Sequence, residues 1–189
     1  MGQYLPCFKA YDVRGKVPSE LNPDIAYAIG RAYADQIQPK KVCIGYDIRL
    51  SGPELYRAIA QGFNDAGVDV VHLGMIGTEM VYFATAAYGL DGGIMITASH
   101  NPPEYNGLKM VHAESRPISG DTGLLEIERR AHEYLQAKPT PTGSGKIEDR
   151  DAYADFTAHL LKIVDPSELK PLQILADPGN GAAGIALDH

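Results

Sequence analysis

Short apolar runs alternate with helical patterns through the first half of this chain, and this alternation limits the fold more than any other feature. Residues 42–45, 68–73 and 94–96 have the apolar character of buried strands. Between them, Asn22-Pro23-Asp24 has the residue types of a helix start, and Ser51-Gly52-Pro53-Glu54 has the spacing of a capping box. Strands that alternate with helices favour an α/β layer structure.

A further strand-like run, residues 108–112, follows the turn signal Asn106-Gly107. If this run pairs with residues 94–96 as a hairpin, Lys109 is folded back towards Ser99. The hairpin would add an antiparallel strand to an otherwise parallel sheet. We therefore predict an α/β fold with a mixed sheet sandwiched by helices.

The segment 138–145, Lys-Pro-Thr-Pro-Thr-Gly-Ser-Gly, has the composition of a linker and offers little that a core could bury. It follows a predicted amphipathic helix at residues 121–136. We place a domain boundary after it. Residues 1–145 then form the first domain, and residues 146–189 form the incomplete start of a second α/β domain.

In this second part we expect a helix at about residues 150–164 and a strand at residues 172–176. The strand leads into Gly179-Asn180-Gly181-Ala182-Ala183-Gly184, which satisfies the G-x-G-x-x-G pattern of dinucleotide-binding folds. The remaining strand and the acidic ribose partner of such a fold would lie beyond His189. A nicotinamide-binding unit is therefore an alternative that this pattern supports only weakly.

Composition argues against several classes of partner. The formal net charge of −7 argues against nucleic acid, because binding to a phosphate backbone needs a basic face. No apolar run approaches the roughly 20 residues of a membrane helix, and the N-terminus lacks the features of a signal peptide. Cys7 and Cys43 suggest neither a disulfide framework nor a metal site. We expect a cytoplasmic protein with no nucleic-acid or membrane partner.

Small and polar residues, and then prolines, end the 94–96 strand: Thr97-Ala98-Ser99-His100-Asn101-Pro102-Pro103. The prolines hold a rigid loop that presents a serine and a histidine at the lip of the strand. Together with Tyr105-Asn106-Gly107-Leu108-Lys109, this loop resembles the phosphoserine loop of the α-D-phosphohexomutases, a family that includes phosphoglucomutases and phosphomannomutases. Phe8-Lys9-Ala10-Tyr11-Asp12-Val13-Arg14-Gly15 and Gly45-Tyr46-Asp47-Ile48-Arg49-Leu50-Ser51-Gly52 resemble further landmarks of this family, and so does the glycine run at residues 179–184.

Two other segments resemble the bacterial phosphomannomutase branch of the family. They are Gly77-Thr78-Glu79 and Arg116-Pro117-Ile118-Ser119-Gly120-Asp121-Thr122-Gly123-Leu124. The resemblance covers essentially the whole chain, and its landmarks occur in the order that the family has.

The resemblance implies a chemistry for Ser99. A resting phosphoserine donates its phosphoryl group to a hydroxyl of a hexose monophosphate, and the resulting 1,6-bisphosphate turns over and returns its other phosphate to the serine. The resemblance also implies Mg²⁺, held partly by an oxygen of the Ser99 phosphate. From the residues alone, a loop serine more often caps a turn.

Four further residues are candidates for the same site. Lys109 would act as general acid/base, a role that the predicted hairpin also favours, although an edge-strand lysine is commonly a solvated charge. His100 would donate a hydrogen bond to the transferring oxygens or assist proton transfer. Arg14 has a fork that suits phosphate, and the resemblance puts Arg14 and Tyr11 in the substrate site. Arg49 is a weaker candidate, since an arginine before a helix start is often only a surface charge.

The family is built from four domains, and this chain resembles the first and the start of the second. The substrates that the resemblance implies are mannose 1-phosphate and mannose 6-phosphate. Glucose 1- and 6-phosphate are the alternative, for a phosphoglucomutase or a dual-specificity mutase. Because the metal, sugar-selecting and distal phosphate loops belong to later domains, we expect no meaningful turnover from this chain alone. A non-catalytic phosphosugar-binding or structural module is the other class.

Overall fold

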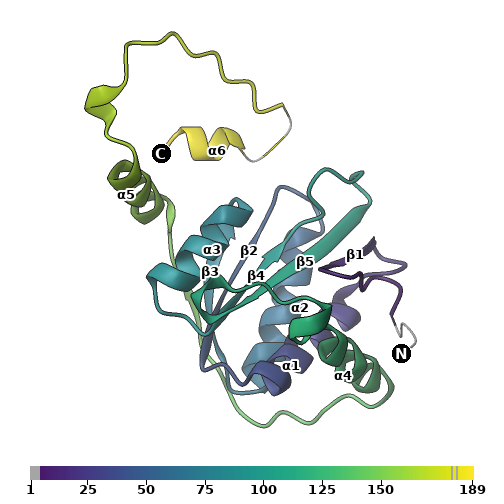
Figure 1. The fold of residues 1–189 in the computed structure, drawn as a ribbon. Coiled ribbons are helices and arrows are strands. Elements are labelled where there is room, and N and C mark those ends of the chain that lie inside the picture. Colours follow the sequence, from purple (N-terminus) through teal and green to yellow (C-terminus); the bar gives the residue numbers. More distant parts are fainter. Residues whose placement is uncertain (1–4, 180, 182) are drawn as a thin grey trace.

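The computed structural model describes residues 5–179, 181 and 183–189 (Figure 1). Its centre is a six-stranded sheet with the strand order β1-β5-β4-β2-β3-β6. The strands are β1 (Val13–Lys16), β2 (Lys41–Tyr46), β3 (Asp69–Met75), β4 (Gly92–Ile96), β5 (Tyr105–His112) and β6 (Ile147–Asp149). The helices are α1 (Pro23–Ile37), α2 (Gly52–Asp65), α3 (Thr78–Ala87), α4 (Leu124–Gln136), α5 (Tyr153–Ile163) and α6 (Ala183–Leu187), with 3-10 turns η1 (Ala113–Ser115), η2 (Gly120–Thr122) and η3 (Pro166–Glu168).

The sheet is mixed, as predicted. β2 is parallel to both of its neighbours, β3 and β4, and β6 is parallel to β3. β5 is antiparallel to β4 and to β1. Parallel strands need crossover connections, and α2 and α3 supply them between β2, β3 and β4. The alternation of strands and helices in the sequence is therefore the alternation of sheet and crossover in the fold.

Helices cover both faces of the sheet, which confirms the predicted sandwich (Figure 1). α1, α2 and α4 lie together on one face, where Phe63 and Ile94 belong to the larger hydrophobic cluster. α3 lies on the other face, where Met80 and Met95 belong to a second cluster. Successive residues of β4 thus point into different cores, and this explains why the strand is apolar without interruption.

One predicted helix cap is confirmed and the other is wrong. Asn22 caps α1, because its side chain accepts a hydrogen bond from the Ile25 N–H at 3.0 Å. Ser51 has helical backbone angles and makes no capping hydrogen bond to α2. Its hydroxyl instead accepts a hydrogen bond from Asn106 Nδ2 at 2.8 Å, which ties the start of α2 to β5.

The β4–β5 hairpin is confirmed, but Asn106-Gly107 is not its turn. Both residues lie inside β5, where Gly107 pairs with Arg14 of β1, and the hairpin connection is the longer segment 97–104. Glycine is needed at this position because a Cβ would lie 2.2 Å from Val13 O. Gly107, which resembled part of a turn signal, instead lets β1 approach β5 closely.

The segment 138–145 lies against the first domain. Arg31 of α1, which is only 4% exposed, donates to Thr140 O and to Thr142 Oγ1, both at 3.1 Å. The chain then adds β6 to the edge of the sheet, where His72 Nδ1 lies 2.7 Å from Asp149 Oδ1. The sheet therefore continues to Asp149, and the domain boundary after residue 145 stays a prediction.

Beyond β6, α5 forms where a helix was expected, and its Tyr153 hydroxyl donates to Met75 O at 2.9 Å. The strand predicted at residues 172–176 is wrong: this segment has no strand partner among the described residues, and a strand needs one for its N–H and C=O groups. Two members of the glycine-rich motif, residues 180 and 182, lie outside the described residues. No helix in the described part of the chain combines the length and apolar character that crossing a membrane requires.

Candidate active site

The loops that carry the candidate residues gather at one end of the sheet, where β2 and β4 finish. Tyr46 pairs with Ile96 at the ends of these parallel strands, so the residues after them leave the sheet side by side. The Asp47 N–H donates to Ile96 O at 3.0 Å and extends the pairing by one step. The carboxyl ends of parallel strands are the usual place for ligand sites in α/β folds.

Ser99 is exposed on the loop after β4 and has a strained backbone. Its φ is 54°, in the left-handed region that residues with a Cβ rarely adopt. Such a conformation costs about 1–3 kcal/mol and persists only where surrounding contacts hold it. Ser99 Oγ lies 3.4 Å from His100 Nδ1, which is a long hydrogen bond.

Arg49 supplies many of the contacts that hold this loop. Its Nη2 donates to Ser99 O at 2.8 Å and to Asn101 O at 2.7 Å. Its Nη1 donates to Pro102 O at 2.7 Å and to Tyr105 O at 2.9 Å. The Arg49 side chain is only 10% exposed. The expectation that it is a surface charge is therefore wrong.

Asp47 and Thr97 connect Arg49 to the backbone of Ser99. Asp47 Oδ2 lies 3.3 Å from Arg49 Nε, an ion pair whose alignment falls short of a hydrogen bond. The same carboxylate oxygen accepts the Thr97 hydroxyl at 2.6 Å. Thr97 Oγ1 in turn accepts the Ser99 N–H at 2.9 Å. Both the N–H and the C=O of Ser99 are thus held by this group of side chains.

Arg14 and Lys109 meet on one carboxylate. Arg14 lies opposite Gly107 in the β1–β5 ladder, so Arg14 and Lys109 are diagonal neighbours on one face of the sheet. Arg14 Nη2 lies 2.9 Å from Asp12 Oδ2, and Lys109 Nζ lies 3.5 Å from the same oxygen. Two cations share one anion here, which leaves a local excess of positive charge.

The strand register sets the spacing between Lys109 and Ser99. Lys109 pairs with Met95, four residues before Ser99. Only Ile96 of β4 follows Met95, so the loop that carries Ser99 begins one strand residue, about 3.3 Å, beyond the level of Lys109. The hairpin thus brings Lys109 to the end of the sheet from which the Ser99 loop extends, with its ammonium held at Asp12.

Tyr11 is exposed, and three further basic residues have local partners. Tyr11 precedes Asp12 and is 80% exposed, so its ring projects from the same N-terminal segment as Arg14. Three other basic residues are held by local partners: Lys9 Nζ donates to Pro6 O, Lys16 Nζ lies 5.7 Å from the centre of the Tyr105 ring, and Arg116 Nε lies 3.9 Å from Glu114.

Asp12, Asp47 and Thr97 were not singled out from the sequence. Each aspartate stands two positions before an arginine of the site, as Asp12-Val13-Arg14 and Asp47-Ile48-Arg49. This repeated spacing was the one available signal, since in both cases the carboxylate pairs with that arginine. Nothing in the local pattern connects Thr97 to Asp47.

Neither cysteine is suited to be a nucleophile. Cys7 and Cys43 are fully buried. Burial raises the pKa of each thiol from its ordinary value of 9.0 to about 11. The reactive thiolate is therefore scarce at neutral pH.

The described residues do not by themselves complete a metal site. Among residues 5–179, 181 and 183–189, no group of three or more His, Cys, Asp or Glu side chains is placed to hold an ion. The two carboxylates of the candidate site, Asp12 and Asp47, already pair with Arg14 and Arg49. Mg²⁺ would find only part of the six oxygen ligands that it prefers.

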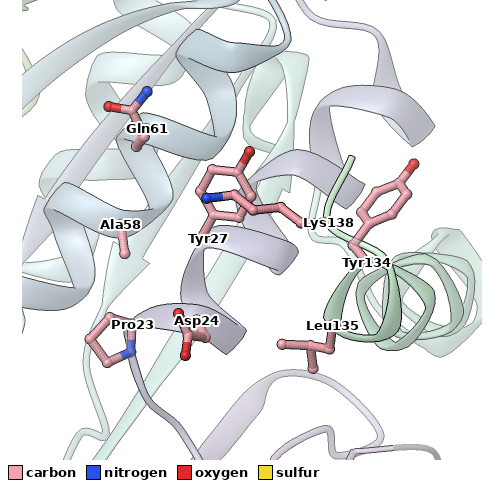
Figure 2. A pocket seen from close by; sticks show the side chains of 8 residues that line it. All are labelled: Pro23, Asp24, Tyr27, Ala58, Gln61, Tyr134, Leu135 and Lys138. Atoms are coloured by element: carbon pink, nitrogen blue, oxygen red, sulfur yellow. The ribbon is translucent and has the colours of Figure 1, made fainter. Parts of the chain in front are cut away.

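A separate groove of about 370 Å³ lies between α1, α2 and α4. Figure 2 shows Lys138 extended across Tyr27, with Tyr134 on one side and Gln61 on the other. Lys138 Nζ lies 4.6 Å from the centre of the Tyr27 ring. None of the predicted site residues lines this groove.

A family model described as phosphoglucomutase/phosphomannomutase, alpha/beta/alpha domain I, matches residues 6–138. The chain belongs to this family. The matched region contains β1 to β5 and all five predicted site residues of this phosphohexomutase chain, which are Tyr11, Arg14, Ser99, His100 and Lys109. The resemblance and the α/β fold expected from it are therefore confirmed.

Curated relatives of this chain are named phosphomannomutase or phosphohexose mutases. Phosphomannomutases from Salmonella montevideo and from Escherichia coli strain K12 are each 50% identical to it over 187 residues. A protein from Xanthomonas campestris pv. campestris strain B100, named phosphohexose mutases, is 46% identical over 185 residues. These matches cover 97% of this chain but only 40% or 41% of the relatives. The chain thus spans about 40% of the length of the curated relatives it matches.

Solved structures of the family have the same fold. A phosphoglucomutase/phosphomannomutase family protein from Burkholderia thailandensis is 36% identical with a TM-score of 0.73, and the match covers 86% of this chain and 36% of that one. A putative phosphomannomutase from Thermus thermophilus is 27% identical with a TM-score of 0.71, covering 85% of this chain and 36% of that one.

Proposed function

We propose that this chain supplies the phosphoryl-carrying serine of a phosphohexomutase of the phosphomannomutase type, and that Ser99 is this residue. The observation that supports it best is the exposed, strained Ser99 on a loop whose carbonyls Arg49 holds. Phosphoryl transfer asks the protein mainly for position and for neutralisation of charge. The phosphomannomutase relatives support the same reaction.

The reaction begins with phosphorylated Ser99 and a hexose monophosphate. Lys109 first releases a proton from the ammonium held at Asp12 to solvent. The bond from phosphorus to Ser99 Oγ then breaks as a new bond forms to a sugar hydroxyl oxygen, whose proton passes to the neutral amine of Lys109. His100, whose Nδ1 lies 3.4 Å from Ser99 Oγ, supplies the proton that the serine oxygen takes up. After the 1,6-bisphosphate has turned over, Ser99 attacks its other phosphate and both protons return. Phosphate has then moved between the 6- and 1-positions, and nothing is oxidised or reduced.

The two cations on Asp12 have different roles in this proposal. Arg14 binds the phosphate of the substrate, since a guanidinium fork matches phosphate oxygens, and the exposed Tyr11 contacts the sugar beside it. Lys109 moves the proton of the sugar hydroxyl.

The substrates in this proposal are mannose 1- and 6-phosphate. Glucose 1- and 6-phosphate are the alternative, because the matching family model includes phosphoglucomutases. In this proposal an oxygen of the Ser99 phosphate is one ligand of Mg²⁺. A cytoplasmic location, without a nucleic-acid or membrane partner, completes the proposal.

The test uses the 189-residue chain with mannose 1,6-bisphosphate or glucose 1,6-bisphosphate, with and without Mg²⁺. Intact-mass measurement should detect one added phosphoryl group in the wild-type chain and none in Ser99→Ala. An unchanged mass with both donors, in a chain whose circular dichroism is native, would contradict the proposal and favour a non-catalytic module. A full cycle between the two monophosphates should stay undetectable for this chain alone, because it spans about 40% of its relatives' length.

A further inference from the structure

The backbone of Ser99 is held from both sides by side chains that the proposed chemistry does not use. Its C=O accepts a hydrogen bond from Arg49, and its N–H donates one to Thr97. The φ of 54° at Ser99 is unfavourable for a serine, so these contacts must hold it in place. If they were lost, the loop would relax and Ser99 Oγ would point elsewhere.

The hydrogen-bond count of Arg49 excludes a direct role in phosphate binding. A guanidinium has five N–H donors. Its Nη1 and Nη2 carry four of these donors and contact four backbone carbonyls, those of Ser99, Asn101, Pro102 and Tyr105. The fifth, on Nε, faces Asp47 at 3.3 Å. This last donor makes no hydrogen bond, but Nε is buried. No accessible donor is therefore left for a phosphate, and Arg49 acts on the loop and not on the substrate.

The loop contacts of Arg49 and the Thr97 contact are parts of one arrangement. Asp47 Oδ1 accepts the Arg49 backbone N–H at 3.0 Å, and Asp47 Oδ2 accepts the Thr97 hydroxyl at 2.6 Å. Asp47 is itself fixed by its N–H bond to the end of β4. The two loops that follow β2 and β4 are thereby joined into one rigid unit.

We propose that Arg49 and Thr97 are the positioning residues of Ser99: they hold its backbone so that Oγ projects from the loop where phosphoryl transfer takes place. This inference rests on the proposed function of Ser99. It predicts an effect on the rate of transfer and none on the affinity for the phosphate donor, because neither side chain has a group that faces the donor.

Two pairs of variants test the inference and leave in place Ser99 and the residues proposed to act on the substrate. Arg49→Lys keeps the charge but has three donors in place of five. Arg57→Ala is its control, since Arg57 is exposed on α2. Thr97→Val removes the hydroxyl and keeps the shape, whereas Thr97→Ser keeps the hydroxyl. Thermal unfolding of every variant establishes that it is folded.

Phosphoryl uptake from a hexose 1,6-bisphosphate is followed in single turnover at increasing donor concentration. For Arg49→Lys and Thr97→Val, the maximal rate should fall by about 10- to 100-fold, because a misplacement near 1 Å has this effect, and the donor concentration at half-maximal rate should change less than about twofold. Hydrogen exchange at the Ser99 amide should accelerate at least about tenfold in both. Thr97→Ser and Arg57→Ala should match the wild type.

Three outcomes would overturn the inference. One is a wild-type rate in Arg49→Lys, which would mean that charge alone suffices. The second is a large rise in the half-maximal donor concentration, which would make Arg49 a phosphate ligand. The third is unchanged exchange at the Ser99 amide. A wild-type chain that takes up no phosphoryl group contradicts the proposed function instead, and the exchange data then decide separately whether Arg49 and Thr97 hold Ser99.

Discussion

The ammonium of Lys109 lies 3.5 Å from the carboxylate of Asp12, and this pair ties β5 to the N-terminal segment. The same carboxylate oxygen lies 2.9 Å from Arg14. The placement of both cations that we propose to act on the substrate therefore depends on one side chain, to which the proposed chemistry assigns no proton or phosphate.

Replacing Asp12 by asparagine should separate placement from stability. Partly exposed ion pairs contribute about 0–1 kcal/mol, so the free energy of unfolding should change by no more than about 1 kcal/mol. Phosphoryl uptake by Ser99 should nevertheless fall about tenfold, because Arg14 and Lys109 lose their common anchor. Asp155→Asn, which removes a surface pair with Arg150, is the control and should leave uptake unchanged. Wild-type uptake by Asp12→Asn would contradict this role.

Gly107→Ala should detach β1 from the sheet. The added Cβ would lie 2.2 Å from Val13 O, and overpacking of this kind costs about 1–3 kcal/mol. Chemical denaturation should show this loss, and the amides of residues 13–16 should exchange faster than those of β4. Gly89→Ala is the control: its φ of 61° makes an alanine strained there, but no heavy atom lies within 4 Å of the added Cβ, so any loss of stability does not come from a clash. Equal exchange in β1 of the two variants would contradict the steric argument.

Local patterns predicted the elements that depend on local contacts. The cap at Asn22 needs only residues within three positions, and it was predicted correctly. Asn106-Gly107 failed as a turn because the deciding contact comes from Val13, which is adjacent in space but far away in the sequence. The strand expected at residues 172–176 failed because a strand exists only with a partner, and its apolar pattern does not reveal whether one is near.

The sequence supplied candidate residues for the site but did not reveal the contacts among them. The loop motif pointed to Ser99 and the hairpin to Lys109. The role of Arg49 could not be predicted, because its four acceptors are backbone carbonyls. Every residue has such a carbonyl, so the sequence does not show which ones Arg49 contacts. The shared carboxylate of Asp12 was hidden for a related reason: it depends on the register of β1 against β5.

Arg31→Leu should free the segment 138–145. It would remove the donor to Thr140 O and Thr142 Oγ1; both residues are exposed, so water can replace that donor, and each hydrogen bond contributes about 0.5–1.5 kcal/mol. The free energy of unfolding should fall by this amount, and limited proteolysis should cut within 138–145 faster. Arg129→Ala, which removes exposed pairs on α4, should leave the cleavage rate unchanged. A cleavage rate that does not respond to Arg31→Leu would contradict the docking of this segment.

The free energy of unfolding should fall at alkaline pH because of the buried thiols. The pKa of Cys43 is about 11 in the folded chain against an ordinary value of 9.0, because burial disfavours the thiolate. Above pH 9 the unfolded chain loses this proton first, so the contribution is complete below pH 9 and disappears as the pH rises towards 11. At about 1.4 kcal/mol per pKa unit, the loss is about 2–3 kcal/mol. Urea unfolding across this pH window should show a smaller fall for Cys43→Ala than for the wild type, and an equal fall would contradict the assignment.

The account as a whole depends on Ser99 carrying a phosphoryl group. The most direct measurement is peptide mapping by tandem mass spectrometry after the chain has been exposed to a hexose 1,6-bisphosphate. We predict a single phosphate, on Ser99 and on no other residue of the loop 97–104. A phosphate found on a different residue, or none on a folded chain, would contradict the central claim.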